Sequence, residues 1–209
     1  MKFLAHRGFW EQPEERNRVD ALERALRCGY GLETDIRDAA GELVIAHDPP
    51  VGVVPRATEL LAMARTHGIQ LPLALNLKAD GLRSRLLSLL KDQPGQNYFC
   101  FDMSAPETLA CHRDGLRFFT RESEIESAPV LYRQSAGVWM DMFESDWIQP
   151  ADIRRHLEAG KEVALVSPEL HKRPHLAFWQ RLRDAGLAGE PRLMLCTDLP
   201  ADADRFFHA

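Results

Sequence analysis

The sequence predicts an α/β fold, a (β/α)8 TIM barrel, and three observations lead to that expectation. Short apolar segments typical of strands recur eight times, near residues 3, 32, 73, 98, 117, 138, 163 and 193. Segments with helical spacing follow most of them, and no linker rich in Pro, Gly or Ser divides the chain. Polar residues stand where the strands end, which is where this fold builds its active sites. A doubly wound open sheet is the main alternative.

The helices are expected where apolar residues recur at i, i+3 and i+4 between the strands. The first covers about residues 18–28, with Asn17 as its N-cap and Gly29 as its stop. Further helices are predicted at about residues 58–65, 82–90, 105–111, 151–159, 175–184 and 201–207.

Size and composition suit one barrel domain over residues 1–209. The hydrophobic fraction of 45% and the charged fraction of 27% are ordinary for a soluble globular protein. The net charge is −5 and there is no long basic run, which argues against nucleic acid as a partner. The N-terminus turns polar too soon for a signal peptide, and no apolar run could span a bilayer. With four widely spaced cysteines expected as free thiols, we predict a cytoplasmic protein with no stable membrane association.

A carboxylate pair marks the second strand. Glu33 and Asp35 lie two positions apart, so their side chains point to the same side of the strand. They repel each other unless a cation sits between them, and hard oxygen ligands suit Mg²⁺ or Ca²⁺. After a turn at residues 39–41, a short apolar strand delivers His47 back towards the pair. One hairpin is therefore expected to hold a divalent metal and a titratable imidazole.

Further polar residues fall at the ends of the first and third strands. His6 and Arg7 follow the first strand, and Lys78 shares a face of the third with Asn76. Two imidazoles beside a metal can exchange the protons that phosphodiester hydrolysis requires. Positive charge from Arg7, Lys78 and the metal would neutralise the phosphoryl oxygens. Each signal is weak alone, but together they favour a phosphodiesterase.

In combination these motifs resemble the glycerophosphodiester phosphodiesterase family, which is related to the phosphatidylinositol-specific phospholipase C superfamily. The resemblance is carried by His6-Arg7-Gly8, Asn17, Glu33 and Asp35, His47-Asp48, Asn76-Leu77-Lys78 and the ending Cys196–Pro200. It implies a barrel in which Glu33 and Asp35 bind a divalent cation. It also implies that His6 and His47 are the acid–base pair and that Arg7 and Lys78 hold the phosphate.

The chain departs from the family pattern in two places. The family usually has a third carboxylate where this chain has Asn76, but an amide oxygen can also ligate Mg²⁺ or Ca²⁺. We expect Asn76 to remain a metal ligand, with Asp141 or Glu169 compensating for the missing charge. The family also usually carries an inserted segment before the third strand. Only residues 49–70 occupy that interval here, which predicts a compact barrel with little or no insertion after the second strand and a more open pocket.

Trp139, Glu169 and His171, at the ends of the sixth and seventh strands, are further candidates for substrate binding. The polar stretch 167–173 directly follows an apolar strand, where a barrel places its substrate loops, and we expect it to contact the alcohol side of the substrate. The expected reaction is metal-dependent hydrolysis of a small phosphodiester to a phosphomonoester and an alcohol. A phospholipase C-like reaction that forms a cyclic phosphate is one alternative. A catalytically silent barrel that only binds phosphorylated ligands is another, although a silent site has no need for two titratable histidines.

Overall fold

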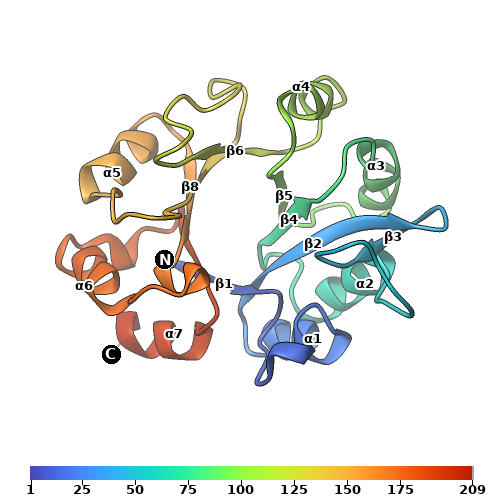
Figure 1. Cartoon of the computed structure of the whole chain (residues 1–209), viewed down its shortest axis with the longest axis horizontal. Helices are drawn as coiled ribbons and strands as arrows, with labels where there is room; N and C mark the ends of the chain where they lie inside the picture. The colour runs from blue at the N-terminus through green and yellow to red at the C-terminus, as the bar shows by residue number, and fades with distance from the viewer. Residues whose placement is uncertain (209) are drawn as a thin grey trace.

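In the computed structural model, which describes residues 1–208, eight parallel strands curve into a nearly closed barrel ringed by helices (Figure 1). The strands are β1 (Lys2–His6), β2 (Gly31–Ala39), β4 (Leu73–Leu77), β5 (Tyr98–Phe101), β6 (Phe119–Glu122), β7 (Gly137–Met140), β8 (Glu162–Val166) and β9 (Leu193–Thr197). Their order around the sheet is β5-β4-β2-β1-β9-β8-β7-β6. A single isolated bridge between Cys100 and Phe118 joins its two ends. The predicted barrel is confirmed.

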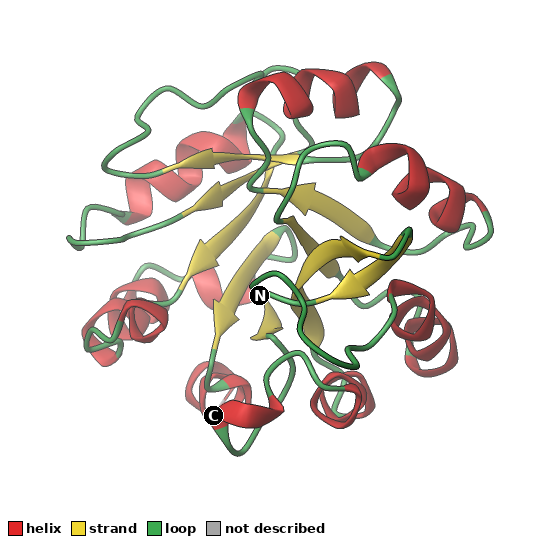
Figure 2. Ribbon diagram, turned by 45° about the vertical axis from the view of Figure 1, so that its right-hand side comes forward, coloured by secondary structure: helices red, strands yellow, loops and turns green. Residues whose placement is uncertain are grey.

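Helices connect the strands and cover the outside of the barrel (Figure 2). They are α1 (Val19–Arg27), α2 (Ala57–His67), α3 (Arg83–Lys91), α4 (Ala105–Arg113), α5 (Pro150–Glu158), α6 (Leu176–Asp184) and α7 (Pro200–His208). The predicted helices agree with these bounds to within about two residues at most ends, the precision expected of such boundaries. Residues 123–136, between β6 and β7, contain no α-helix. Within residues 1–208, none of the helices is long and apolar enough to cross a membrane.

The second half of β2 pairs antiparallel with β3 (Glu42–Ile45), so that Ile36 lies opposite Ile45. Ala40 and Gly41 make the tight turn, both with positive φ. The hairpin leads into an irregular stretch, residues 46–56, and then directly into α2. No further domain is inserted between the hairpin and β4, as the sequence predicts.

Alternation along the strands separates an apolar interior from a polar rim. The barrel interior is filled by Leu4, Ala74, Phe99, Phe101, Phe119, Trp139, Ala164, Val166, Met194 and Cys196. Because side chains two apart on a strand share a face, the next inward position towards the carboxyl end lies directly above this layer. That position holds His6 above Leu4, Asn76 above Ala74 and Asp141 above Trp139. The candidate site residues therefore stand on a packed aromatic and aliphatic floor.

Two larger apolar clusters lie outside the barrel, beneath the helices. The first joins β2, β3 and β4 to α1, α2 and α3, and the second joins β7, β8 and β9 to α5, α6 and α7. Burial of this apolar surface is the main stabilising contribution to such a fold. The four cysteines are free thiols; Cys28 is exposed and the other three are buried.

Two expectations about local structure are wrong. The apolar run at residues 116–119 predicts the fifth strand, but the observed strand, β6, begins at Phe119 because its pairing with β7 covers residues 119–122. Leu116 and Phe118 instead pack into the outer cluster. Asn17 is not the N-cap of α1, where Arg18 stands without a side-chain cap. The Asn17 amide is hydrogen-bonded to Asp35 instead.

Candidate active site

The carboxylate of Asp35 is buried at the carboxyl end of the barrel and surrounded by donors. Asn17 Nδ2 donates to Asp35 Oδ2 at 2.8 Å, and Arg7 Nε lies 3.2 Å from the same oxygen. Lys78 Nζ lies 3.2 Å from Oδ1, without hydrogen-bond geometry. Burial by itself would raise the pKa of Asp35, but Lys78, Arg7 and the Asn17 hydrogen bond outweigh it and lower that pKa. Asp35 is therefore an anion in the folded protein.

The neighbouring carboxyl group, Glu33, has a different environment. It is 3% exposed, and its Oε2 lies 3.8 Å from His6 Nε2, beyond hydrogen-bond distance. Burial raises the pKa of Glu33 to about 7, with the charge of Asp35 adding to the effect and that of His6 opposing it. An additional positive charge beside Glu33 would stabilise the ionised form of its carboxyl group.

Asn76 stands opposite Asp35 in the β2–β4 register. Its Nδ2 donates to Asp102 Oδ2 at 3.3 Å, while its Oδ1 is buried and has no hydrogen-bond partner. Glu33 Oε2 and Asp35 Oδ1 are likewise buried and without a hydrogen-bond partner. Buried polar atoms in folded proteins are nearly always paired, so three such oxygens on adjacent strands require an explanation.

A divalent cation fits this oxygen set. Carboxylate and amide oxygens are the ligands that Mg²⁺ and Ca²⁺ take in proteins, and the cation would supply the positive charge that Glu33 lacks. Within residues 1–208, no group of three or more His, Cys, Asp or Glu side chains is suited to hold a metal ion. A cation bound to Glu33 and Asp35 would therefore depend on the Asn76 oxygen for its third protein ligand.

His6 is oriented by a carboxylate from the far end of the chain. Its Nδ1 lies 2.7 Å from Asp198 Oδ1, just after β9. Since an ionised carboxylate only accepts hydrogen bonds, Nδ1 carries the proton and Nε2 is left facing Glu33. Arg16 Nη2 lies 3.6 Å from Asp198, and the guanidinium stacks on the ring of Trp10. The sequence marks Asp198 as a polar strand end but does not identify its partner.

His47 lies in the irregular stretch after β3, with 44% of its side chain exposed. Its Nδ1 lies 3.0 Å from Asp48 Oδ1, so its Nε2 is also the nitrogen that remains available. His47 and Arg7 line one hollow of about 310 Å³ beside the rim, together with Arg16 and Arg18. The structure thus places the second histidine next to Arg7, on the solvent side of the site.

The backbone around Arg7 is held in an unusual conformation. Arg7 and Asn17 have φ values of +58° and +59°, in the left-handed region that non-glycine residues seldom adopt. Arg7 N donates to the carbonyl of Glu33 and Asn17 N donates to the carbonyl of Arg7, both at 2.8 Å. Gly8 follows at φ +96°, and a Cβ there would lie 2.8 Å from the carbonyl carbon of Ala21 in α1. Such local strain is characteristic of functional sites, and here it directs the Arg7 side chain onto Asp35.

The three further candidates for substrate binding, Trp139, Glu169 and His171, have different surroundings. Trp139 is 4% exposed and stacks on Phe101 at 3.9 Å, so it belongs to the barrel interior. Both carboxylate oxygens of Glu169 accept hydrogen bonds, from the hydroxyls of Ser167 and Thr197. His171 is the most exposed of the three, with 25% of its side chain accessible, at the end of the short 3-10 helix Pro168–His171 that follows β8.

His171 Nε2 lies 2.7 Å from Asp141 Oδ1, and this hydrogen bond raises the pKa of His171. Asp141 is therefore hydrogen-bonded to His171, and Glu169 accepts hydrogen bonds from the hydroxyls of Ser167 and Thr197. Neither of these two carboxylates, expected to compensate for the missing charge at Asn76, is hydrogen-bonded to Asn76. The carboxylate partner of Asn76 is Asp102, which directly follows β5.

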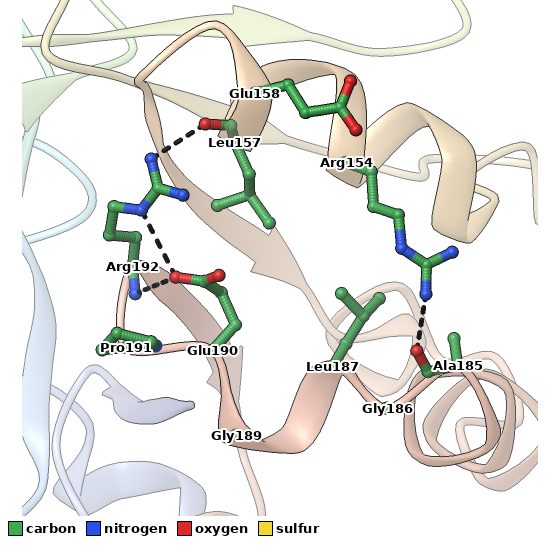
Figure 3. A pocket seen from close by; sticks show the side chains of 10 residues that line it. All are labelled: Arg154, Leu157, Glu158, Ala185, Gly186, Leu187, Gly189, Glu190, Pro191 and Arg192. Atoms are coloured by element: carbon green, nitrogen blue, oxygen red, sulfur yellow. Dashed lines mark hydrogen bonds and ion pairs between the residues drawn. The ribbon is translucent and has the colours of Figure 1, made fainter.

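A separate hollow of about 560 Å³ opens at the amino-terminal end of the strands, between the end of α5 and residues 185–192 (Figure 3). The guanidinium of Arg154 donates to the carbonyl of Ala185, and that of Arg192 donates to the carbonyl of Leu157 and to Glu190. Its two arginines therefore already have acceptors, and none of the predicted site residues lines it.

No model of a known protein family matches the chain, and no curated protein sequence matches it. Solved structures do match. A phosphodiesterase from Oleispira antarctica, in complex with the product sn-glycerol-3-phosphate, superposes with a TM-score of 0.74 and 17% identity, over 100% of this chain and 97% of the other. A glycerophosphodiester phosphodiesterase from Agrobacterium tumefaciens gives 0.70 and 18%, over 100% of both chains.

A more distant match is a Ca²⁺-dependent phosphatidylinositol-specific phospholipase C from Streptomyces antibioticus. Its TM-score is 0.57 at 12% identity, over 97% of this chain and 95% of the other. At these identities the likeness establishes the fold. The structural resemblance that the N-terminal motifs predict is confirmed at that level.

Proposed function

We propose that this protein is a metal-dependent phosphodiesterase that hydrolyses a glycerophosphodiester-like small molecule to a phosphomonoester and an alcohol. The observation that carries the proposal is the set of three buried oxygens without a hydrogen-bond partner, on Glu33, Asp35 and Asn76, with the positive charges of Arg7 and Lys78 beside Asp35. The fold, shared with solved phosphodiesterases, supports the same reaction class, although barrels of this kind host many chemistries.

Glu33, Asp35 and Asn76 would hold one Mg²⁺ or Ca²⁺ ion. When bound, such an ion supplies positive charge that stabilises the phosphoryl oxygens in the transition state. Arg7 and Lys78 would bind the same phosphate group. Each has further N–H donors besides the one nearest Asp35, because a guanidinium carries five and an ammonium three. Binding the phosphate does not require either side chain to abandon Asp35.

His6 and His47 would transfer the protons. Hydrolysis needs one group to take a proton from the attacking water and another to give one to the leaving alkoxide. Nδ1 of His6 is hydrogen-bonded to Asp198 and Nδ1 of His47 to Asp48, so each ring has Nε2 available for proton exchange.

The alcohol side of the substrate would contact His171. Trp139 and Glu169 would support that side from beneath, through the barrel interior and through the hydrogen bonds to Ser167 and Thr197. We further propose that the protein acts in the cytoplasm, where free cysteines such as the three buried here remain reduced.

The test is hydrolysis of a generic aryl phosphodiester by the purified protein, after EDTA treatment and after addition of Mg²⁺, Ca²⁺ or Mn²⁺. We expect turnover that EDTA abolishes and a divalent ion restores. His6→Ala should lower kcat by about 100-fold or more, the usual contribution of a general acid or base.

The products separate the alternatives. A phosphomonoester and an alcohol are expected from a glycerophosphodiester, and a cyclic phosphate would show the phospholipase C-like reaction instead. Absence of turnover with every metal, with calorimetric binding of a phosphate ligand retained, would leave a binding protein. Full activity in His6→Ala would contradict the assignment of the acid–base pair.

A further inference from the structure

The side-chain amide of Asn76 can serve a cation in only one of its two orientations. Its oxygen is a ligand, whereas its NH₂ group carries two hydrogens that would repel a cation and donate to carboxylates. Asn76 Oδ1 is the unpartnered atom at the rim, and Nδ2 points the other way, to Asp102. Some feature of the structure must favour this orientation over its reverse.

Asp102 supplies that preference. It follows β5 directly, adjacent to Asn76 across the β4–β5 pair, and its Oδ2 accepts the hydrogen bond from Asn76 Nδ2 at 3.3 Å. An ionised carboxylate has no proton to donate, so it cannot accommodate the amide oxygen in place of the NH₂ group. Rotating the amide by half a turn would place two oxygen atoms against each other and lose the hydrogen bond.

Asp102 is itself fixed in place. Its other oxygen, Oδ1, accepts from Arg121 Nη1, and Arg121 Nε donates to Glu126. The backbone of Asp102 has φ +70°, a left-handed conformation that turns the side chain out of the regular alternation of β5. The result is a chain of side chains, Asn76–Asp102–Arg121–Glu126, that ends at the surface.

We propose that Asp102 is a positioning residue for the cation: by accepting from the Asn76 amide it turns the Asn76 oxygen towards Glu33 and Asp35. The inference rests on the proposed function, since it concerns the same cation site. Asp141 and Glu169, the two carboxylates expected to compensate for the missing charge, are hydrogen-bonded elsewhere. Outer partners that orient metal ligands typically contribute about 10- to 100-fold in metal affinity.

The test is calorimetric titration of Mg²⁺ or Ca²⁺ alone into EDTA-treated protein. Asp102→Asn keeps the shape of the side chain but replaces one acceptor by an NH₂ group, which favours the reversed amide of Asn76. We expect the cation affinity to fall by about tenfold or more. Glu126→Gln removes a charge from the other partner of Arg121 without touching Asn76, and should leave the affinity within about twofold of the wild type.

In a reciprocal exchange, Asn76→Asp together with Asp102→Asn, the oxygen that faces the site no longer depends on the direction of an amide. The new carboxylate at position 76 accepts from the new NH₂ group at position 102, and its second oxygen faces the site, while the net charge of the pair is unchanged. We expect this double variant to recover the affinity that Asp102→Asn loses.

Three outcomes would overturn the inference. They are an unchanged affinity in Asp102→Asn, a double variant as weak as the single one, and a wild-type protein that hydrolyses phosphodiesters without binding either cation. The last result would leave the hydrolytic activity standing, so that failure of the inference and failure of the proposed function are distinguishable.

Discussion

At the scale of single residues, the site depends on which nitrogen of an imidazole carries the proton. His6 and Asp198 meet although 192 positions separate them in the sequence. The contact is possible because β1 and β9 are neighbours in the barrel, with Ala5 opposite Thr197. Asp198 therefore fixes the tautomer and the direction of the His6 ring.

We expect Asp198→Asn to lower kcat for phosphodiester hydrolysis by about 100-fold, the scale of one general acid or base. An asparagine can present its NH₂ group to Nδ1, which moves the imidazole proton to Nε2. The measurement is kcat under saturating metal and substrate. The matched control is Asp204→Asn, because Asp204 makes the same contact, 2.7 Å to a histidine Nδ1, with His208 in α7. Equal losses in the two variants would contradict a specific role for Asp198.

The sequence predicts single site residues well where one strand carries several of them. Glu33 and Asp35 share a face because the period of a strand is two, and no tertiary information is needed to see it. Hydrogen bonds between distant strands cannot be read from spacing. The contacts of Asp198 with His6 and of Asp102 with Asn76 both depend on which strands are neighbours in the barrel. Trp139 lies in the barrel interior because the polar rim on its strand begins at the next inward-facing residue, Asp141.

At the scale of elements, the turn after β1 and helix α1 form one rigid unit. Gly8 packs directly against the backbone of Ala21 and Leu22, so α1 can approach the turn only if position 8 has no side chain. Phe9 N donates to the Ala21 carbonyl at 2.9 Å, and this hydrogen bond also keeps α1 close to the turn. The glycine of the His-Arg-Gly motif is therefore explained by packing as well as by its left-handed φ.

Two glycine-to-alanine variants distinguish these causes. Gly41 has a similar φ of +88°, but a Cβ there would meet nothing within 4 Å. Gly41→Ala should cost about 1 kcal/mol from the backbone conformation alone. Gly8→Ala should cost about 1–3 kcal/mol more, because the added methyl group forces β1 and α1 apart. Urea unfolding of both variants measures the difference, and equal losses would show that packing against α1 is unimportant.

The positions of the elements are more predictable from the sequence than their exact ends. Helices α1 to α7 follow from apolar spacing, since each buries one face against the barrel. The start of β6 does not follow, because its apolar residues Leu116 and Phe118 serve the outer cluster before the strand begins to pair. Which part of an apolar run joins a sheet is decided by the neighbouring strand, here β7.

At the scale of the whole molecule, the barrel closes unevenly. β2 and β4 pair over five residues, whereas β5 and β6 meet through the one bridge at Cys100 and Phe118. Helix α4 connects β5 to β6 across this seam, so the difference lies in the strand pairing. Fewer backbone hydrogen bonds should make this seam the part of the barrel that opens most readily.

Hydrogen exchange monitored by mass spectrometry would test this expectation. Amide protons in residues 119–122 should exchange faster than those in β1, β2 and β9, which have a paired strand on each side. Uniform protection around the barrel would show that side-chain packing, such as Phe99 against Phe119 at 3.7 Å, compensates for the missing ladder.

The seam also marks a boundary in the core. One outer apolar cluster belongs to the strands and helices before it and the other to those after it, with β1 and β9 joining the halves. The residues proposed for the phosphate and the cation all precede the seam, and those proposed for the alcohol all follow it. Descendants of this chain could therefore acquire new substrates by divergence of the later half alone, and chimaeras that exchange residues 123–192 between relatives would transfer the preference for an alcohol without rebuilding the hydrolytic centre.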